Sequence, residues 1–167
     1  YTNLMAAAQA PEIVDMAGNI QSFLFTMLLT LIPFIIIAGP ATAGATYIIR
    51  NWARDEHAWV WSDFKDAWKQ NWKESLLVML INGIAILTFY VNIHFYSLQG
   101  SKGLIYLLLR YMIILIGIIY AMMNMFIFPM LVTYKLKLRQ IFKNALIFTM
   151  AELPRAFVIF LLAFLLF

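Results

Sequence analysis

The sequence predicts an all-α integral membrane protein: a helical bundle of about four transmembrane helices plus an amphipathic helix at the cytoplasmic membrane surface. Of its 167 residues 64% are hydrophobic and 12% are charged, and the mean hydropathy is +0.84. Soluble domains have about 45–50% apolar and about 25% charged residues. The excess apolar surface has to face lipid, and the whole chain, residues 1–167, is expected to form one transmembrane domain.

The predicted spans are long apolar runs separated by charged segments. A crossing of the roughly 30 Å hydrocarbon core takes about 20 residues. The third run exceeds this length, so we expect its helix to be tilted, kinked near Pro129, or extended beyond the bilayer. The runs are Ile20–Ala38, Leu76–Phe95, Leu104–Tyr134 and Ala145–Phe167.

The fourth run allows two interpretations, because Glu152, Pro154 and Arg155 interrupt it. Its span begins either near residue 145 or near Pro154, a residue favoured in the first turn of a helix. In the second case residues 140–151 form an interfacial helix. The spacing of Glu152 and Arg155 favours an ion pair that anchors the helix at the interface. Because the run is still apolar at Phe167, we expect further protein after it.

The positions of the basic residues predict the topology. The segments 50–74 and 135–144 are rich in lysine and arginine, whereas the turn Ser97–Gly103 carries only Lys102. Basic loops face the cytoplasm. We therefore expect a multi-pass membrane protein with both basic segments cytoplasmic and the N-terminus outside.

The small residues after the first apolar run predict a turn and close helix packing. Gly39 and Pro40 break the first helix, and residues 41–54 are expected to form a short helix. Small side chains, including Gly44, let helices approach closely. A phosphate-binding loop is excluded because the Lys-Ser/Thr ending is missing.

An aromatic stripe follows in the basic segment. The spacing of its members places them on one helical face, beside a row of lysines and after Ser62, a plausible N-cap. Such a helix lies at the headgroup level or docks onto a partner protein, and we favour the membrane surface. The stripe consists of Trp61, Phe64, Trp68 and Trp72.

Few polar residues lie within the predicted spans. Asn82 and Asn124 are nearest to mid-depth, and we expect them to hydrogen-bond between helices. His94 belongs near the outer aromatic belt. Arg110 is close enough to its helix end for its head to extend toward the interface.

The sequence predicts no enzyme. It has no cysteine and two histidines, His57 and His94, which the topology places on opposite sides of the membrane. No catalytic or metal-binding pattern occurs, so we expect no cofactor and no metal. The basic residues flank apolar runs, which indicates lipid and not nucleic acid as the partner.

Several short motifs resemble the YesL/YteU-like family of small bacterial membrane proteins. They are Gly39-Pro40-Ala41-Thr42-Ala43, Tyr47–Trp52, Asp63-Phe64 through Trp68, Asn71-Trp72-Lys73, Asn144-Ala145-Leu146 and Leu153-Pro154-Arg155. The chain departs from the family's pattern in its N-terminal stretch, residues 6–19, and in its C-terminal end.

The resemblance implies a bacterial cell membrane as the location and a function through protein contacts. Members of that family lie beside genes of carbohydrate ABC importers, which implies an accessory membrane subunit that binds importer permease subunits through its helices. The alternatives are a membrane-embedded regulator or sensor of sugar uptake, and a free-standing small transporter. The coupling-helix signature of a permease itself is absent from the sequence.

Overall fold

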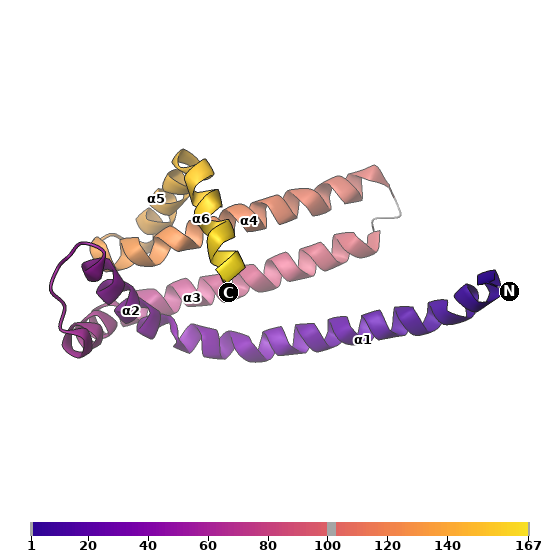
Figure 1. Cartoon of the computed structure of the whole chain (residues 1–167), viewed down its shortest axis with the longest axis horizontal. Helices are drawn as coiled ribbons and strands as arrows, with labels where there is room; N and C mark the ends of the chain where they lie inside the picture. The colour runs from indigo at the N-terminus through magenta and orange to yellow at the C-terminus, as the bar shows by residue number, and fades with distance from the viewer. Residues whose placement is uncertain (1, 100–102, 167) are drawn as a thin grey trace. The chain divides into compact units, whose positions relative to one another are not determined.

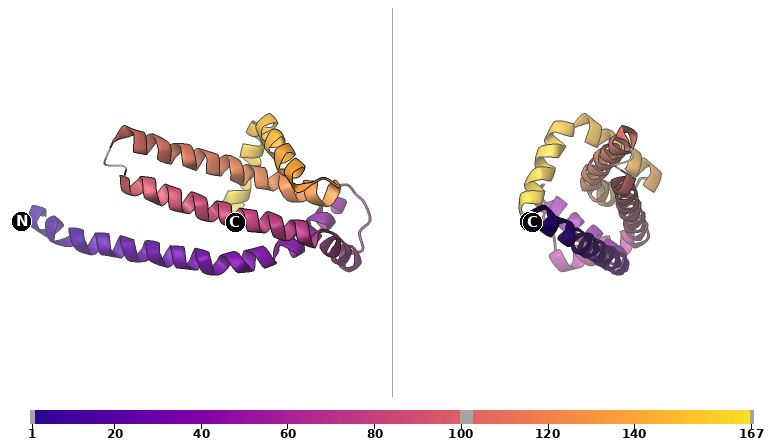
Figure 2. Two further views of the ribbon diagram at one scale, coloured as in Figure 1. Left: turned by 180° about the vertical axis from the view of Figure 1, so that it is seen from behind. Right: turned by 90° about the vertical axis from the view of Figure 1, so that its right-hand side faces the viewer.

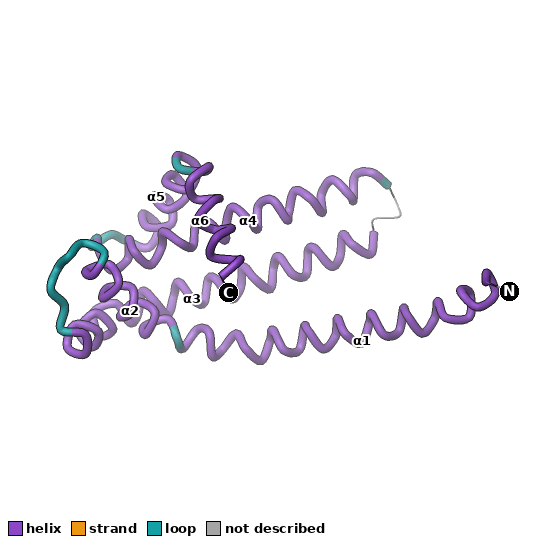
Figure 3. The backbone as a smooth tube through the Cα atoms, viewed as in Figure 1, coloured by secondary structure: helices purple, strands orange, loops and turns teal. Residues whose placement is uncertain are grey.

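The structure is a computed structural model that describes residues 2–99 and 103–166, and every regular element in these residues is an α-helix (Figures 1 and 3). The chain divides into two compact units, Tyr1–Ile35 and Ile36–Phe167, and each is described by itself. The helices are α1 (Thr2–Ile37), α2 (Gly39–Trp52), α3 (Val60–Gln99), α4 (Leu104–Thr133), α5 (Leu138–Ala151) and α6 (Leu153–Leu166).

Almost all of α1 belongs to the first unit. Its segment Gly18–Ile37 is long and apolar enough to cross a membrane. The hydroxyl groups of Ser22, Thr26 and Thr30 each donate to the carbonyl four residues earlier, at 2.8–2.9 Å. These polar groups are thus satisfied within the helix, as a lipid environment requires.

The break between α1 and α2 falls where the sequence predicts it. The helix is interrupted at Ala38, and Pro40 lies in the first turn of α2. Proline is tolerated there because a first-turn N–H has no partner within the helix. The short helix predicted over residues 41–54 is observed over Gly39–Trp52.

Helices α3 and α4 lie side by side as an antiparallel pair in Figure 1 and in the left view of Figure 2. Each is long and apolar enough to cross a membrane. Pro129 lies inside α4, which continues past it to Thr133. Lys102, the basic residue of the predicted turn between these helices, lies outside the described residues.

The expectation of a separate surface helix before the second span is wrong. α3 runs without interruption through 40 residues, from Val60 to Gln99. No glycine or proline separates the aromatic stripe from the apolar run at Leu76, so the helix has no reason to stop. At 1.5 Å per residue such a helix is about 60 Å long, roughly twice the hydrocarbon thickness, and its aromatic end projects beyond the apolar part.

The start of α3 also differs from the expected N-cap at Ser62. The backbone N–H of Trp59 donates to a carboxylate oxygen of Asp63 at 2.9 Å, and the helix begins at Val60. Asp63 does lie in the first turn, where its charge complements the positive end of the helix dipole.

The fourth apolar run is divided into two helices. α5 ends at Ala151 and α6 starts at Leu153, and the two are bent by 86°. One straight helix over residues 145–166 is not observed, and the boundary at Glu152 is compatible with both predicted starts of the span. In the described residues three helices are long and apolar enough to cross a membrane, and a fourth crossing requires α5 and α6 to form one bent span. That fourth crossing remains a prediction.

The buried core lies toward one end of the second unit, where α2, the first half of α3, the end of α4 and the start of α5 come together. We call this the basic end, because the predicted cytoplasmic segments 50–74 and 135–144 lie there. Toward the opposite end, α3 and α4 expose their large apolar side chains. The core consists of Ala43, Val78, Met123, Ile127, Phe128, Met130, Leu131, Ile141 and Ala145.

Candidate interface at the basic end of the bundle

Two glycines bring α2 close to α3. A Cβ atom added at Gly39 would lie 2.7 Å from the carbonyl oxygen of Ser75, and one at Gly44 would lie 2.8 Å from the ring of Phe64. Real Cβ contacts are longer than this, so both positions require glycine. Ser75 is fully buried at this crossing, and its hydroxyl is satisfied by the carbonyls of Asn71 and Trp72.

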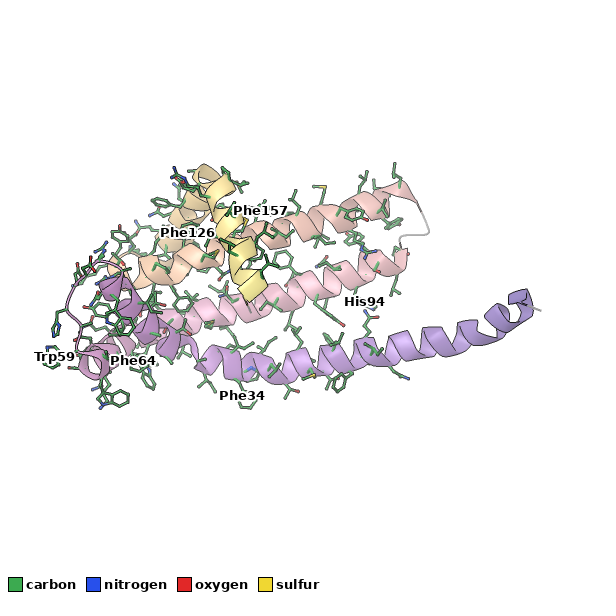
Figure 4. All side chains as sticks on the ribbon, in the orientation of Figure 1. Phe34, Trp59, Phe64, His94, Phe126 and Phe157 are labelled. Carbon is green, nitrogen blue, oxygen red and sulfur yellow. The ribbon has the colours of Figure 1, made fainter. Side chains whose placement is uncertain are left out.

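The aromatic stripe on α3 is divided by this packing. Phe64, which is labelled in Figure 4, is half-buried, and its ring lies against Gly44 on α2. The ring stacks on that of Trp61 with centroids 6.2 Å apart. Trp68 meets the other side of Phe64 edge to face at 5.8 Å. The indoles of Trp61, Trp68 and Trp72 remain 69%, 44% and 48% exposed. The stripe thus combines one packing residue with three exposed indoles.

Trp68 and Trp72 also line a mainly apolar hollow of about 490 Å³. Its other walls come from the end of α1, the start of α2 and the next turn of α3, namely Ile37, Pro40, Lys69 and Leu76. Neighbouring lysines lie over the stripe: Lys65 Nζ is 4.8 Å from the centre of the Trp61 ring, and Lys73 Nζ is 5.4 Å from that of Trp72. This surface therefore offers aromatic and cationic groups together.

Arg50 ties α2 to the end of α4. Its Nε and Nη2 donate to the side-chain oxygen of Asn51 at 3.1 and 2.7 Å, and its Nη1 donates to the carbonyl of Val132 at 3.3 Å. Its guanidinium also lies 4.7 Å from the centre of the Tyr47 ring. The last carbonyls of a helix lack partners within the helix and carry partial negative charge, so Arg50 stabilises the C-terminus of α4.

Two adjoining hollows separate α3 from the connection between α4 and α5. The first has about 530 Å³ and polar walls that include Gln70, Asn71 and Thr133. The second has about 550 Å³, and we call it the lysine groove. The two share Glu74, Lys135 and Leu136. The lysine groove is lined by Lys73, Glu74, Leu77, Lys135, Leu136, Lys137 and Leu138.

The lysines of this groove are exposed. The ion pairs observed in the described part of the chain are Arg54–Glu56 and Glu152–Arg155, and neither includes a groove lysine. The second pair has the predicted spacing and an N–O distance of 3.0 Å. The groove thus presents cationic groups that remain available to an anion.

Asn82 joins the two central helices. Its side-chain oxygen accepts a hydrogen bond of 2.6 Å from the hydroxyl of Tyr120 on α4. Asn124 instead donates to the carbonyl of Tyr120 in its own helix at 2.9 Å, and its side-chain oxygen is buried without a partner. The structure therefore gives Asn82 an interhelical contact through Tyr120 and does not pair Asn82 with Asn124.

The remaining polar residues of the spans lie toward the opposite end. The ring of His94 stacks with that of Tyr90 at 6.5 Å. Arg110 is half-buried on α4, and its Nε is buried without a hydrogen-bond partner. Within residues 2–99 and 103–166, no group of three or more histidine or acidic side chains could hold a metal ion.

Sequence reasoning missed three features of this interface: the Arg50 contact with α4, the hydroxyl of Tyr120 and the lysine groove. From the sequence, Arg50 and the groove lysines indicated only which segments face the cytoplasm. Each feature depends on the approach of segments that are distant in the chain. The one local signal for these contacts in the sequence is that Asn51 directly follows Arg50, which places an amide oxygen beside a guanidinium.

Residues 19–93 match the family described as "Protein of unknown function, DUF624". The match covers the apolar part of α1, all of α2 and most of α3, which is less than half of the chain. The motifs from Gly39 to Lys73 lie inside the matched residues, whereas those at Asn144 and Leu153 lie outside them. No curated protein and no solved structure shows a significant match to the chain. What this comparison shows is a similarity to DUF624 proteins over the segment that builds the packing of α2 on α3.

Proposed function

We propose that this chain is an accessory membrane subunit that binds the permease subunits of a carbohydrate ABC importer through its transmembrane helices. The observation that carries the proposal is the uneven packing of α3 and α4. Their buried side chains gather at the basic end, whereas large apolar side chains toward the opposite end are exposed on both helices. These faces are available to lipid and to the helices of a partner. The choice of partner rests on the resemblance to YesL/YteU-like proteins.

The aromatic surface at the basic end supports the same proposal. Trp61, Trp68 and Trp72 are exposed on a helix whose position is held by the close packing of α2. Tryptophan is enriched at the centres of protein interfaces, where a large rigid side chain gives contact area at low entropic cost. In this proposal the indoles brace the assembly on the cytoplasmic side or lie on the inner leaflet.

Copurification from native membranes tests the proposal. A tagged chain is extracted with a mild detergent, and the proteins retained are identified by mass spectrometry. We expect permease subunits of a carbohydrate importer to be retained. A chain that is recovered alone from its native membrane contradicts the proposal.

Site-specific photocrosslinking identifies the face that makes the contact. A photoreactive residue is placed at the exposed Val91 or Leu115, with the buried Ile127 as the matched control. We expect crosslinks to the permease from the exposed positions and none from Ile127. Adducts with lipid alone at both exposed positions count against a permease contact through this face.

A membrane-embedded regulator of sugar uptake is the second candidate. The observation that favours it is the continuity of α3, which joins the aromatic surface to the far end of the helix pair without a break. A displacement at one end is therefore carried to the other by a single rigid element. A deletion that abolishes sugar-induced transcription and leaves uptake intact supports the regulator, whereas a loss of uptake itself supports the accessory subunit.

A further inference from the structure

We propose that the lysine groove binds a phospholipid with an anionic headgroup. This inference is independent of the accessory-subunit proposal, because it concerns a surface of this chain alone. The groove lies between α3 and the short connection from α4 to α5. It combines three lysines with three leucines around a volume of about 550 Å³, which is within the range of roughly 300–1,000 Å³ found for small-molecule sites.

The groove lies at the boundary between polar and apolar surface on each of its walls. On α3, Lys73 and Glu74 lie one helical turn before Leu77. On the opposite wall, α4 ends at Thr133 and Lys135 follows. Two separate segments therefore change from charged to apolar at the same place, which is the arrangement of charges and hydrocarbon in a phospholipid.

The third wall has the same order as α3, with the charged residue before the apolar one. Lys137 directly precedes Leu138, the first residue of α5. The backbone N–H of Lys137 donates to the side chain of Gln140 at 3.1 Å, which holds the start of the helix beside the groove. The lysine and leucine are thus adjacent on an ordered turn, with the lysine side chain exposed.

The charge of the groove selects the headgroup. Three lysines and one glutamate give its lining residues a formal charge of +2. The lysines take no part in the ion pairs observed among the described residues, so a phosphate does not have to displace an internal carboxylate. Basic pockets between transmembrane helices on the cytoplasmic side bind anionic lipid headgroups, and the positive-inside rule predicts that this end faces the cytoplasm.

The size of the apolar walls favours a lipid over a soluble phosphate. Leu77, Leu136 and Leu138 contribute side chains that a free anion cannot use. Burial of an acyl chain is favourable for each methylene that leaves water. A ligand that carries both groups therefore gains from both kinds of wall.

The test uses the full purified chain in a neutral detergent. Phosphatidylglycerol, phosphatidylcholine and soluble glycerol phosphate are added separately, and binding is measured by native mass spectrometry and by the rise in unfolding temperature. A ligand that binds only the folded state raises that temperature with its concentration. We expect phosphatidylglycerol to bind, and phosphatidylcholine and glycerol phosphate to bind far more weakly.

Two triple variants of equal charge separate the groove from general electrostatic attraction. The groove variant carries Lys73→Gln, Lys135→Gln and Lys137→Gln. The control carries Lys65→Gln, Arg139→Gln and Lys143→Gln, which are exposed and do not line the groove. A lysine near an anionic surface contributes about a fivefold change in affinity. We therefore expect the groove variant to bind phosphatidylglycerol about a hundredfold more weakly, if the three contributions add, and the control to bind like the parent chain.

A single substitution tests whether the charge of the groove controls lipid binding, because it removes an anion and keeps all three lysines. Glu74→Gln removes the carboxylate of the groove and is expected to tighten phosphatidylglycerol binding about fivefold, the factor for one charge at such a surface. Equal weakening in both triple variants overturns the proposal, because it identifies a diffuse attraction to net charge. Equal binding of glycerol phosphate and phosphatidylglycerol overturns the assignment to a lipid, and identifies a site for a free phosphate.

Discussion

Arg50 of α2 is bonded to the carbonyl oxygen of Val132 in the last turn of α4, with a distance of 3.3 Å from its Nη1. The two residues are 82 positions apart in the chain. Two further hydrogen bonds to the Asn51 side chain hold the guanidinium in place. This contact joins the short helix after the first apolar segment to the end of the longest apolar run, and it adds to the packing of α2 on α3.

Replacement of Arg50 is expected to destabilise the basic end. Hydrogen bonds of a charged group contribute about 1.5–3 kcal/mol, so Arg50→Ala should lower the free energy of unfolding by about this amount. Arg50→Lys should recover only part of it, because an ammonium group cannot reproduce the fork of the guanidinium. Thermal or denaturant unfolding of the full chain in detergent measures both effects.

Arg54→Ala is the matched control for this prediction. Arg54 is an exposed cation close to Arg50 in the chain, and its ion pair with Glu56 has an N–O distance of 3.9 Å. Exposed pairs contribute about 0–1 kcal/mol. If Arg54→Ala costs as much stability as Arg50→Ala, net charge and not the contact with Val132 explains the loss.

The close packing of α2 on α3 predicts that Gly39→Ala and Gly44→Ala are destabilising. An added methyl group would meet the Ser75 carbonyl oxygen at 2.7 Å or the Phe64 ring at 2.8 Å. Overpacking of this kind costs about 1–3 kcal/mol. Gly39→Ala should be the more severe, because the backbone oxygen is at 2.7 Å from the added Cβ there and at 3.0 Å at Gly44, and a backbone oxygen cannot move aside as a ring can. The unfolding temperature in detergent reports the difference.

Gly117 provides a control within a helix of the same bundle. A Cβ atom there would lie 3.6 Å from the Phe89 ring, which is an ordinary contact. Alanine also has the higher helix propensity, by roughly 1 kcal/mol. Gly117→Ala should therefore leave stability unchanged or raise it, and a loss equal to that of Gly39→Ala would argue against tight packing as the cause.

The hydrogen bond between Tyr120 and Asn82 predicts a measurable coupling between α3 and α4. Tyr120→Phe and Asn82→Leu each remove one partner of the 2.6 Å contact. Interhelical hydrogen bonds in membranes contribute about 0.6 kcal/mol on average, with model peptides giving roughly 1–2 kcal/mol. A double-mutant cycle should give a coupling energy in this range, and additive losses would show that the two side chains act independently.

The elements most accessible from the sequence are those with local causes. Pro40 after Gly39 is sufficient to end α1, and the apolar runs are sufficient to identify α3 and α4, because each cause lies in adjacent residues. The interruption at residues 152–155 likewise predicts a helix boundary. The structure places that boundary at Glu152, between α5 and α6.

The features that escaped prediction depend on what lies beside a segment in space. The aromatic stripe has the periodicity of a surface helix, and the same periodicity fits a projecting end of a long helix. The unbroken course of α3 from Val60 to Gln99 distinguishes these cases, and Phe64 packs on Gly44 of α2 within that helix. The lysine groove likewise requires α3 and the start of α5 to be neighbours, which charge patterning along the chain cannot reveal.

The continuity of α3 predicts a gradient of depth along the aromatic stripe. Trp61 and Trp72 are separated by eleven residues in one unbroken helix, which corresponds to about 16 Å along its axis. Proteins that retain only Trp61, only Trp68 or only Trp72, with phenylalanine at the other tryptophan positions, are reconstituted in vesicles. Their fluorescence is quenched with brominated acyl chains and, separately, with iodide in the water.

Acyl-chain quenching should increase from Trp61 to Trp72, because Trp72 is nearest to the apolar run that begins at Leu76, and iodide quenching should follow the opposite order. A helix lying flat on the membrane would give all three indoles the same depth, so equal quenching would contradict an unbroken α3 in the bilayer.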